Sequence, residues 1–159
     1  MLVSVVIPAY NAEATLARAV TSALAQRCDA LEVVVAVDDG RDYAALLARA
    51  GIIDARVRFI STGGVRTGCH NARNAGLAAA RGDFIAPLDA DDLYAPGRLA
   101  ALVPIASERG AAVDDAVIVA EDEPGAPLYR ALDAVRGARG HKDPLDAAQL
   151  LALTSPLFP

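Results

Sequence analysis

The sequence predicts an α/β fold, a Rossmann-like and mostly parallel sheet with helices on both faces. Three observations predict it. Apolar runs of strand length alternate with segments of helical period, the strand runs are almost continuous in valine, isoleucine and leucine, and glycine, proline or aspartate separates one segment from the next. Continuous apolar strands are typical of parallel sheets, whose two faces are both covered by crossover helices.

The predicted elements follow one another as strand and helix pairs. Residues 3–7 form the first strand, which Pro8 ends, and residues 14–26 form the first helix, with Asn11 as its N-cap, because apolar side chains recur there at helical spacing. The next elements are strands at 31–37, 57–60, 84–88 and 116–120, and helices at 43–50, 69–81 and from about Pro96. After the fifth strand the pattern weakens to an acidic loop at 121–127 and two short helices at 128–135 and 144–153.

The composition suits one globular core and excludes several classes of partner. Of the 159 residues, 54% are apolar and 22% charged, which allows a core of useful size. A nucleic acid polymer is not an expected partner, because the net charge is −5 and Lys142 is the one lysine. No apolar run reaches bilayer length and the first residues lack the basic start of a signal peptide, so we expect a cytoplasmic protein, with peripheral attachment to a membrane left open. Cys28 and Cys69 are too few for a disulfide framework.

Polar or glycine-rich segments follow four of the predicted strands, at residues 8–11, 38–40, 63–64 and 89–92. Because ligands of parallel sheets bind beyond the carboxyl ends of the strands, we expect these segments to converge on one rim. The last segment contains three closely spaced carboxylates, those of Asp89, Asp91 and Asp92. Crowded carboxylates raise one another's pKa unless a cation neutralises them, and Mg²⁺ or Mn²⁺ takes one or two carboxylates plus substrate phosphates. The cluster therefore indicates a site for a metal and a diphosphate, with a solvated acidic turn as the alternative.

Four motifs, in this order, resemble the successive signatures of the family-two glycosyltransferases with the GT-A fold. They are VSVVIPAYNAE at 3–13, VDDG at 37–40, ARNAGL at 72–77, and GDFI at 82–85 followed by LDADD at 88–92, which holds the D-x-D motif. The resemblance covers residues 3 to about 102, and the remaining third of the chain carries no motif of the family. It implies the GT-A fold and a donor site for a nucleotide-diphospho-sugar.

The resemblance also implies roles for the residues that would bind the nucleoside. It places along the base and ribose the residues that follow the first strand, Pro8, Ala9, Tyr10 and Asn11, with the Tyr10 ring against the nucleobase. Asp39 resembles the carboxylate that accepts a hydrogen bond from the base edge. A pyrimidine imide can donate that bond, so a UDP-linked donor is expected. The alternative for Asp38 and Asp39 is that they cap the next helix.

The remaining donor-site roles belong to arginines and to the acidic cluster. Arg73 would reach the base or the phosphates as a fixed cation, with a surface salt bridge as the alternative. Asp89 would accept from the ribose hydroxyls, Asp91 would ligate Mn²⁺ or Mg²⁺, and Asp92 would support the metal or the sugar. Arg66 lies in a glycine-rich loop, where it could meet phosphate or stay in solvent.

The acceptor side is the part that the sequence does not assign. In an inverting transfer a carboxylate removes the proton of the acceptor hydroxyl, and the family places that residue well beyond the metal motif. Glu121 and Asp122 imitate its Glu-Asp signature but follow directly after the fifth strand, so we interpret them as an exposed loop and keep the base role as an alternative. We expect residues 1–120 to be the nucleotide-sugar-binding core and 121–159 to be the incomplete start of the acceptor region, in a chain truncated at its C-terminus.

Two functions from different classes remain open. One is a metal-dependent, inverting glycosyltransferase that moves a sugar from a nucleotide-diphospho-sugar to a hydroxyl of a saccharide, lipid or protein. The other is a nucleotide-sugar-binding module without transferase activity. The donor sugar, the acceptor and the formation of a homo-oligomer are not assigned. A receiver-like signalling domain is disfavoured because the first strand ends in Pro8 rather than in acidic residues, and a P-loop nucleotidase is excluded because no Gly-Lys-Ser/Thr motif exists.

Overall fold

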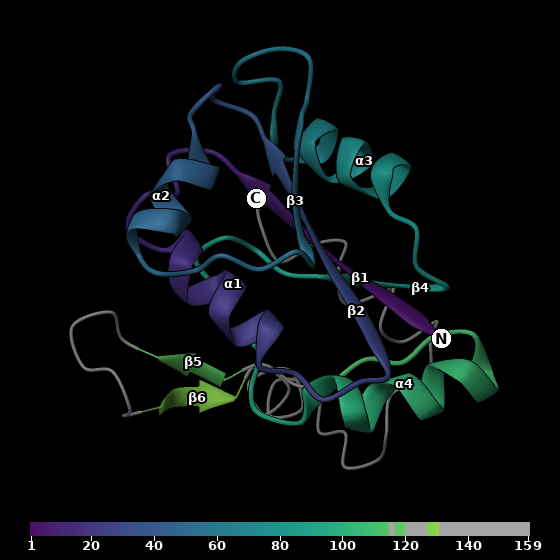
Figure 1. Ribbon diagram of the computed structural model, residues 1–159. Helices are drawn as coiled ribbons and strands as arrows, with labels where there is room; N and C mark the ends of the chain where they lie inside the picture. The colour runs from purple at the N-terminus through teal and green to yellow at the C-terminus, as the bar shows by residue number, and fades with distance from the viewer. Residues whose placement is uncertain (115–116, 120–126, 131–159) are drawn as a thin grey trace, which may run out of the picture. The chain divides into compact units, whose positions relative to one another are not determined.

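The computed structural model describes residues 1–114, 117–119 and 127–130. The chain divides into two compact units, Met1–Ala112 and Val113–Pro159. The first unit contains a four-stranded sheet and the helices α1 to α4 (Figure 1). The described part of the second unit contains a two-stranded antiparallel sheet.

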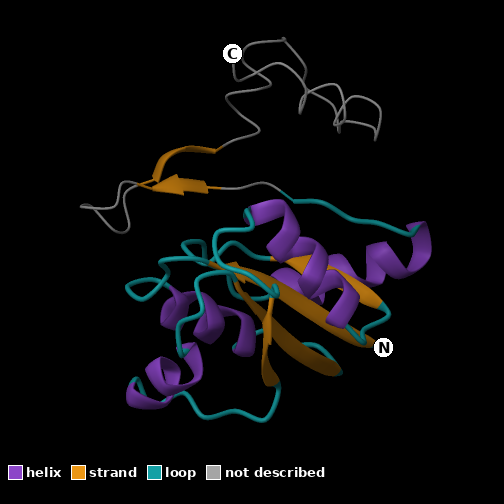
Figure 2. Cartoon of the chain, turned by 90° about the horizontal axis from the view of Figure 1, so that it is seen from above, coloured by secondary structure: helices purple, strands orange, loops and turns teal. Residues whose placement is uncertain are grey.

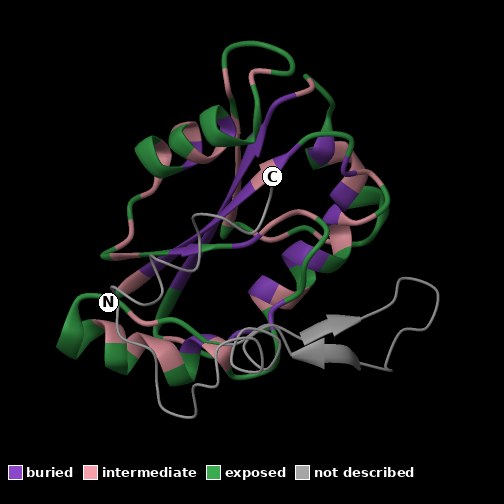
Figure 3. Ribbon diagram, turned by 180° about the vertical axis from the view of Figure 1, so that it is seen from behind, coloured by how far each residue is buried: buried purple, intermediate pink, exposed green. Residues whose placement is uncertain are grey.

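The four strands of the first unit are all parallel and lie in the order β3-β2-β1-β4. Their bounds are Leu2–Ala9 for β1, Ala30–Val37 for β2, Val57–Ser61 for β3 and Phe84–Pro87 for β4. Val5 of β1 pairs with Val33 of β2 on one side and with Ala86 of β4 on the other. The predicted parallel α/β sheet is confirmed, and its central strands β1 and β2 are the most buried part of the unit (Figure 3).

Helices cover both faces of this sheet, as the view along it in Figure 2 shows. Their bounds are Leu16–Leu24 for α1, Tyr43–Arg49 for α2, Cys69–Ala79 for α3 and Arg98–Arg109 for α4. Side chains alternate between the faces of a strand, so the odd-numbered residues of β1 and β2 share one core with α1, α2 and α4. On the other face α3 packs so close to the sheet that a side chain at Gly76 would collide with Val6.

A buried polar cluster lies at the opposite end of the strands from the predicted rim. Glu32, 8% exposed on β2, accepts hydrogen bonds from the Ser4 hydroxyl at 2.6 Å, from the Arg81 amide at 2.7 Å, and from Arg58 Nε and Nη2 at 3.0 and 2.9 Å. Ser4 Oγ also accepts from the Gly82 amide at 2.8 Å. Burial alone raises the pKa of Glu32, but the hydrogen bonds from Ser4, Arg81 and Arg58 together hold it below its usual range. The cluster ties the end of α3 to the sheet.

At the helix starts, the structure contradicts the predicted N-cap Asn11 and the alternative that Asp38 or Asp39 caps a helix. Helix α1 begins at Leu16 with Thr15 at its N-cap, whereas Asn11 lies earlier in a left-handed turn with φ 49°. The reason is that the chain first completes a turn in which the amides of Thr15 and Leu16 both bond to the Ala12 carbonyl. Helix α2 is capped by Asp42, whose side chain accepts from the Ala45 amide at 2.9 Å. Capping is therefore not the role of Asp38 or Asp39.

The fifth predicted strand does not join the parallel sheet. The strand β5, Val117–Val119, pairs in antiparallel fashion with β6, Pro127–Arg130. The helix expected at 128–135 is wrong at its start, because residues 128–130 belong to β6. An antiparallel pair can be joined by a short connection, whereas a parallel strand needs a long crossover. The helix expected at 144–153 lies outside the described residues, as do Glu121 and Asp122.

Within the described parts of the chain, none of the helices has both the length and the apolar character that a bilayer span requires.

Candidate functional site

The predicted rim is built around the end of β2, whose neighbours in the sheet are β1 and β3. Asp38 and Asp39 are the first two residues after this strand. They lie in a bend, and their carboxylates have different partners. Asp38 contacts the loop that follows β3, and Asp39 contacts the segment that follows β1.

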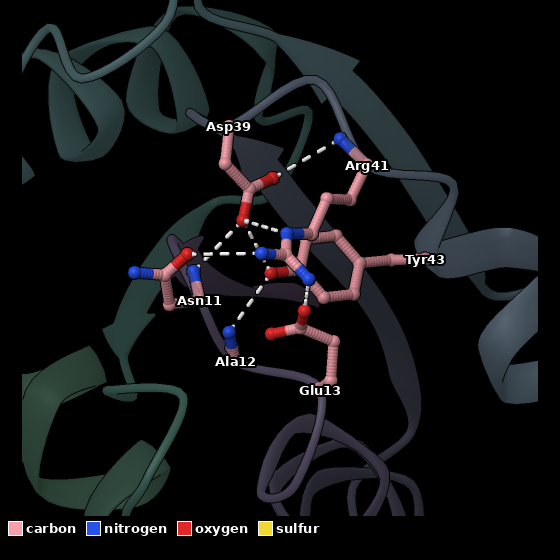
Figure 4. Close-up of polar contacts among 6 residues, drawn as sticks. All are labelled: Asn11, Ala12, Glu13, Asp39, Arg41 and Tyr43. Carbon is pink, nitrogen blue, oxygen red and sulfur yellow. Dashed lines mark hydrogen bonds and ion pairs between the residues drawn. The ribbon is translucent and has the colours of Figure 1, made fainter.

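Asp39 organises the segment after β1 (Figure 4). Its Oδ2 accepts from the Asn11 amide at 2.8 Å and from the Tyr43 hydroxyl at 2.7 Å, and its Oδ1 accepts from the Arg41 amide at 3.1 Å. The Tyr43 oxygen in turn accepts from the amide of Ala12 at 2.8 Å. Burial, followed by the hydrogen bond to Asp39, raises the pKa of Tyr43 to about 12, so its hydroxyl remains a donor at neutral pH.

The Arg41 guanidinium places a positive charge beside the Asp39 carboxylate. Its guanidinium forms an ion pair with Glu13, lies 3.5 Å from Asp39 Oδ2 through Nε, and donates to Asn11 Oδ1 at 3.3 Å. The Asp39 side chain is only 5% exposed. A carboxylate offers about four lone pairs, and three hydrogen bonds from the described residues already occupy it, which leaves room for about one further donor.

Asp38 organises the glycine-rich segment after β3. Its Oδ1 accepts from the hydroxyls of Thr62 and Thr67 at 2.8 and 2.6 Å and from the Thr67 amide at 3.0 Å, while Oδ2 accepts from the Gly68 amide at 3.0 Å. The hydrogen bond from the Thr67 hydroxyl is the largest cause that lowers the pKa of Asp38, which lies at about 2 despite burial. The carboxylate is therefore charged at neutral pH and fixes residues 62–68.

Tyr10 and Arg66 meet between these two anchored segments. The Tyr10 side chain is 41% exposed, and the Arg66 guanidinium carbon lies 5.9 Å from the centroid of its ring. Asn11 and Arg66 have φ values of 49° and 56°, and among the described residues they are the non-glycine positions with positive φ. Such conformations are held by surrounding contacts and are frequent at functional sites. Here the contacts are the hydrogen bonds of Asp39 and Asp38.

Arg73 and Asp89 come together from α3 and from the segment after β4. Arg73 Nη2 donates to Asp89 Oδ1 at 2.6 Å, and this hydrogen bond is the main cause that raises the pKa of Arg73. The Asp89 side chain is 44% exposed, and its hydrogen bond to Arg73 uses Oδ1. Arg73 therefore does form the salt bridge that was the alternative to a donor-binding role, and its partner Asp89 is itself a predicted site residue.

Asp91 and Asp92 are exposed beside Asp89. The Asp92 amide bonds to the Asp89 carbonyl at 3.1 Å, which keeps the three residues in one turn. Partial desolvation, followed by the charges of Asp91 and Asp89, raises the pKa of Asp92, as expected where negative charge is not balanced. In the described residues, however, no three His, Cys, Asp or Glu side chains are grouped as a complete metal site. A divalent ion here would fit only with ligands from a bound phosphate, which is how Mg²⁺ is commonly held.

The other predicted donor-site residues differ in exposure. Pro8 is half-buried, and the Ala9 side chain is fully buried within β1, where its carbonyl accepts from the Asp38 amide at 2.9 Å. Tyr43 and Thr67, which bond to Asp39 and Asp38, were not predicted from the sequence. A signal for Tyr43 exists, since an aromatic residue four positions after Asp39 can return to it in the first turn of a helix.

Comparisons with known proteins identify the family of the chain. The model of the family described as "Glycosyl transferase family 2" matches residues 4–150. The succinoglycan biosynthesis protein ExoO of Rhizobium meliloti is 45% identical over 122 residues, which are 76% of this chain and 34% of that protein. The UDP-Glc:alpha-D-GlcNAc-diphosphoundecaprenol beta-1,3-glucosyltransferase WfgD of Escherichia coli is 36% identical over 98 residues, 62% of this chain and 38% of that protein.

A solved structure shares the fold. The S. aureus TarS 1–349 complex with UDP superposes with a TM-score of 0.60 at 24% identity, over 69% of this chain and 33% of that chain. The chain thus spans about a third of the length of each of these three proteins. The family model covers nearly all of the chain, and the four-stranded parallel sheet is the GT-A arrangement that the motifs predicted. This chain belongs to glycosyl transferase family 2.

Proposed function

We propose that this chain forms the donor-binding part of an inverting glycosyltransferase that moves a sugar from a nucleoside-diphosphate sugar to an acceptor hydroxyl. The observation that carries the proposal is the convergence of Tyr10, Asp39, Arg73 and the Asp89 to Asp92 turn on one rim of a parallel sheet. Family membership favours the reaction class, and the name of the relative WfgD, which specifies UDP-Glc, favours a uridine donor.

The nucleoside would bind at the β1 and β2 side of the rim. The exposed Tyr10 ring offers a flat apolar face for the base. The remaining lone pair of Asp39 can accept one hydrogen bond, and a uracil imide would donate it. The hydrogen bonds from the Arg41 amide and the Tyr43 hydroxyl orient that carboxylate. Asp89 would accept from the ribose through Oδ2, because its Oδ1 is already bonded to Arg73.

The diphosphate would lie toward the acidic turn. Asp91 is the residue that we propose as a ligand of Mn²⁺ or Mg²⁺, with Asp92 beside it. A divalent ion bound there would stabilise the negative charge of the nucleoside-diphosphate leaving group. The chain holds Asp91 in the segment after β4. Arg73 supplies a positive charge, and its hydrogen bond to Asp89 raises the pKa of the Arg73 guanidinium.

The acceptor base is a separate question. Inverting transfer needs a carboxylate that takes the proton of the acceptor hydroxyl. Glu121 and Asp122, which the sequence offers as an alternative base, lie outside the described residues. Binding of the nucleotide sugar without transfer is therefore the competing function, and it shares every donor-side contact described above.

Isothermal titration calorimetry with UDP tests the donor site. We expect UDP to bind in the presence of Mn²⁺ or Mg²⁺ and at least tenfold more weakly in chelator. Asp91→Asn, which removes the charge at nearly constant volume, should abolish the difference. Asp29→Asn is the matched control, since Asp29 is exposed at the other end of the sheet, before β2, and should leave it unchanged. Equal UDP affinity with and without metal would reject the role of Asp91.

A second measurement separates transfer from binding alone. The chain is incubated with UDP-glucose, Mn²⁺ and a panel of saccharide acceptors, and the release of UDP is followed. Release that depends on an acceptor would support the transferase. Tight, metal-dependent binding of UDP without any release would favour the binding function for this chain.

A further inference from the structure

The acidic residues lie on a loop, residues 88–93, whose two ends are joined to each other. The loop begins after Pro87, the last residue of β4, and ends before Tyr94. Asp91, Asp92 and Leu93 are exposed, whereas Tyr94 is 7% exposed and belongs to the core of the first unit. The Tyr94 hydroxyl donates to the Pro87 carbonyl at 2.8 Å. We call this hydrogen bond the neck of the acidic loop.

Residues at the end of α1 hold the end of the acidic loop from below. Ser22 Oγ, in the last turn of α1, accepts from the Tyr94 amide at 3.0 Å. Gln26, just past the helix, donates through Nε2 to the Ala95 carbonyl at 3.0 Å and accepts through Oε1 from the Leu99 amide at 3.1 Å. Gln26 is 6% exposed, and a buried amide is costly unless it is hydrogen-bonded. Its side chain therefore fixes both the segment after the loop and the first turn of α4.

The start of the acidic loop is held by the sheet and by α3. The Leu88 amide donates to the Val6 carbonyl at 3.0 Å, and Asp89 accepts from Arg73 at 2.6 Å. With the neck in place, what lies between the two fixed ends is a short exposed turn that carries three carboxylates. Compact loops of this kind, whose ends are close together, are frequently functional.

The contacts at the two ends act against the repulsion among the carboxylates. Like charges in one turn repel each other, so without a cation the turn favours conformations that separate them. Contacts that restrict the loop before a ligand arrives reduce the ordering that binding has to bring about. Residues that orient metal ligands without touching the metal commonly change metal affinity by about 10- to 100-fold.

From these contacts we propose that Tyr94 and Gln26 are positioning residues of the metal site, which hold the acidic loop and thereby set how tightly it binds a divalent ion together with a nucleoside diphosphate. Both residues act through the loop that carries Asp91, and neither needs to touch the ion or the nucleotide. The inference rests on the proposed function, because it assumes that Asp91 ligates the ion. It adds to that function a support for the metal site that comes from α1 and the core.

The test measures the apparent affinity for Mn²⁺ apart from the affinity for the nucleotide. UDP binding is followed by calorimetry over a series of Mn²⁺ concentrations and in chelator, and the midpoint is the Mn²⁺ concentration that gives half of the rise in UDP affinity. Tyr94→Phe removes the neck, and Gln26→Met removes the bonds of the buried amide at nearly constant side-chain length. We expect each variant to raise the midpoint by about 10-fold and to change UDP affinity in chelator by less than twofold.

Two controls distinguish positioning of the metal site from a general loss of stability. Glu32→Gln disturbs the buried cluster at the opposite end of the strands and should leave the midpoint unchanged. In an Asp91→Asn background, Tyr94→Phe should change UDP affinity by less than twofold at every Mn²⁺ concentration, because the ligand through which Tyr94 acts is missing. Circular dichroism checks that each variant is folded. Tyr94→Phe retains the ring in the core, so it decides the question even where Gln26→Met does not fold.

The outcomes separate this inference from the function on which it rests. An unchanged midpoint in Tyr94→Phe would overturn the inference and leave the proposed donor site standing. A loss of UDP affinity in chelator as large as the loss in Mn²⁺ would show that the residues support the whole rim, and an equal shift in Glu32→Gln would show an effect of stability; either result would overturn the inference. If UDP binding by the unaltered chain does not depend on Mn²⁺, the proposed role of Asp91 fails and the inference fails with it.

Discussion

Replacing Tyr43 by phenylalanine tests the network that supports the rim. The Tyr43 hydroxyl donates to Asp39 at 2.7 Å and accepts from the Ala12 amide at 2.8 Å, and the side chain is 1% exposed. Its loss leaves the buried Ala12 amide without this partner, at about 1–3 kcal/mol, and removes a bond to a charged group worth about 1.5–3 kcal/mol. Partial relaxation reduces the sum, so we expect the free energy of unfolding to fall by about 3 kcal/mol.

Urea unfolding followed by circular dichroism measures this change. Thermal unfolding gives a second measure. For a chain of this length each kcal/mol corresponds to about 2–4 °C in Tm, so the Tm of Tyr43→Phe should be roughly 6–12 °C lower. The control is Tyr10→Phe, which removes the same atom from a ring that is 41% exposed at the rim and should change stability by less than about 0.5 kcal/mol. Equal stabilities of Tyr43→Phe and the unaltered chain would refute the reasoning.

The pH dependence of the same pair gives an independent check. The pKa of Tyr43 is raised from 10.0 to about 12, mainly by burial, so the native state holds this proton more tightly than the unfolded chain does. The stability that this proton provides is complete below pH 10 and is lost as pH rises from about 10 toward 12. We expect a steeper alkaline loss of stability in the unaltered chain than in Tyr43→Phe. Parallel profiles would show that the hydroxyl is not held as described.

Three further predictions concern parts of the first unit away from Tyr43. Glu32→Gln should lower the free energy of unfolding by about 3 kcal/mol in urea titrations, because it breaks a buried ion pair, and should leave UDP affinity unchanged. The control Glu108→Gln, at an exposed position, should change neither the free energy of unfolding nor UDP affinity. The pKa of Asp38 is lowered to about 2, so its contribution to stability is present above about pH 4 and is lost between pH 4 and 2; Asp38→Asn should lack this acid transition in circular dichroism. Gly76→Ala should cost about 1–3 kcal/mol, measured as a lower urea midpoint, because the new methyl group meets Val6.

The sheet could be predicted from the sequence because its signal is local. The runs that became β1 and β2 are almost uninterrupted β-branched and aliphatic residues, and burial on both faces leaves few other structures for them. The carboxyl ends of parallel strands lie at the same edge of a sheet, so the placement of Asp39, Asp89 and the segment after β1 at one edge was expected once the strands were predicted to be parallel. The exception was β5, where three apolar residues are too few to distinguish a sheet strand from a hairpin strand.

The contacts within the site could not be predicted in the same way. That Asp38 would bond to Thr62 and Thr67 depends on how a glycine-rich loop returns across β2, which no local pattern specifies. The pairing of Arg73 with Asp89 joins two elements that are 16 residues apart and depends on how α3 packs on the sheet. Glu32 was included in an almost apolar strand, and its burial is explained only by partners on three other segments.

We propose that the rim at the end of β1, β2 and β4 binds a nucleoside diphosphate through Tyr10, Asp39 and Asp91. A crystal structure of the chain with UDP and Mn²⁺ tests it most directly. We expect the uracil on the Tyr10 ring with its imide toward Asp39, and the diphosphate beside Asp91. Ordered UDP bound elsewhere on the protein, with these three side chains untouched, would contradict it.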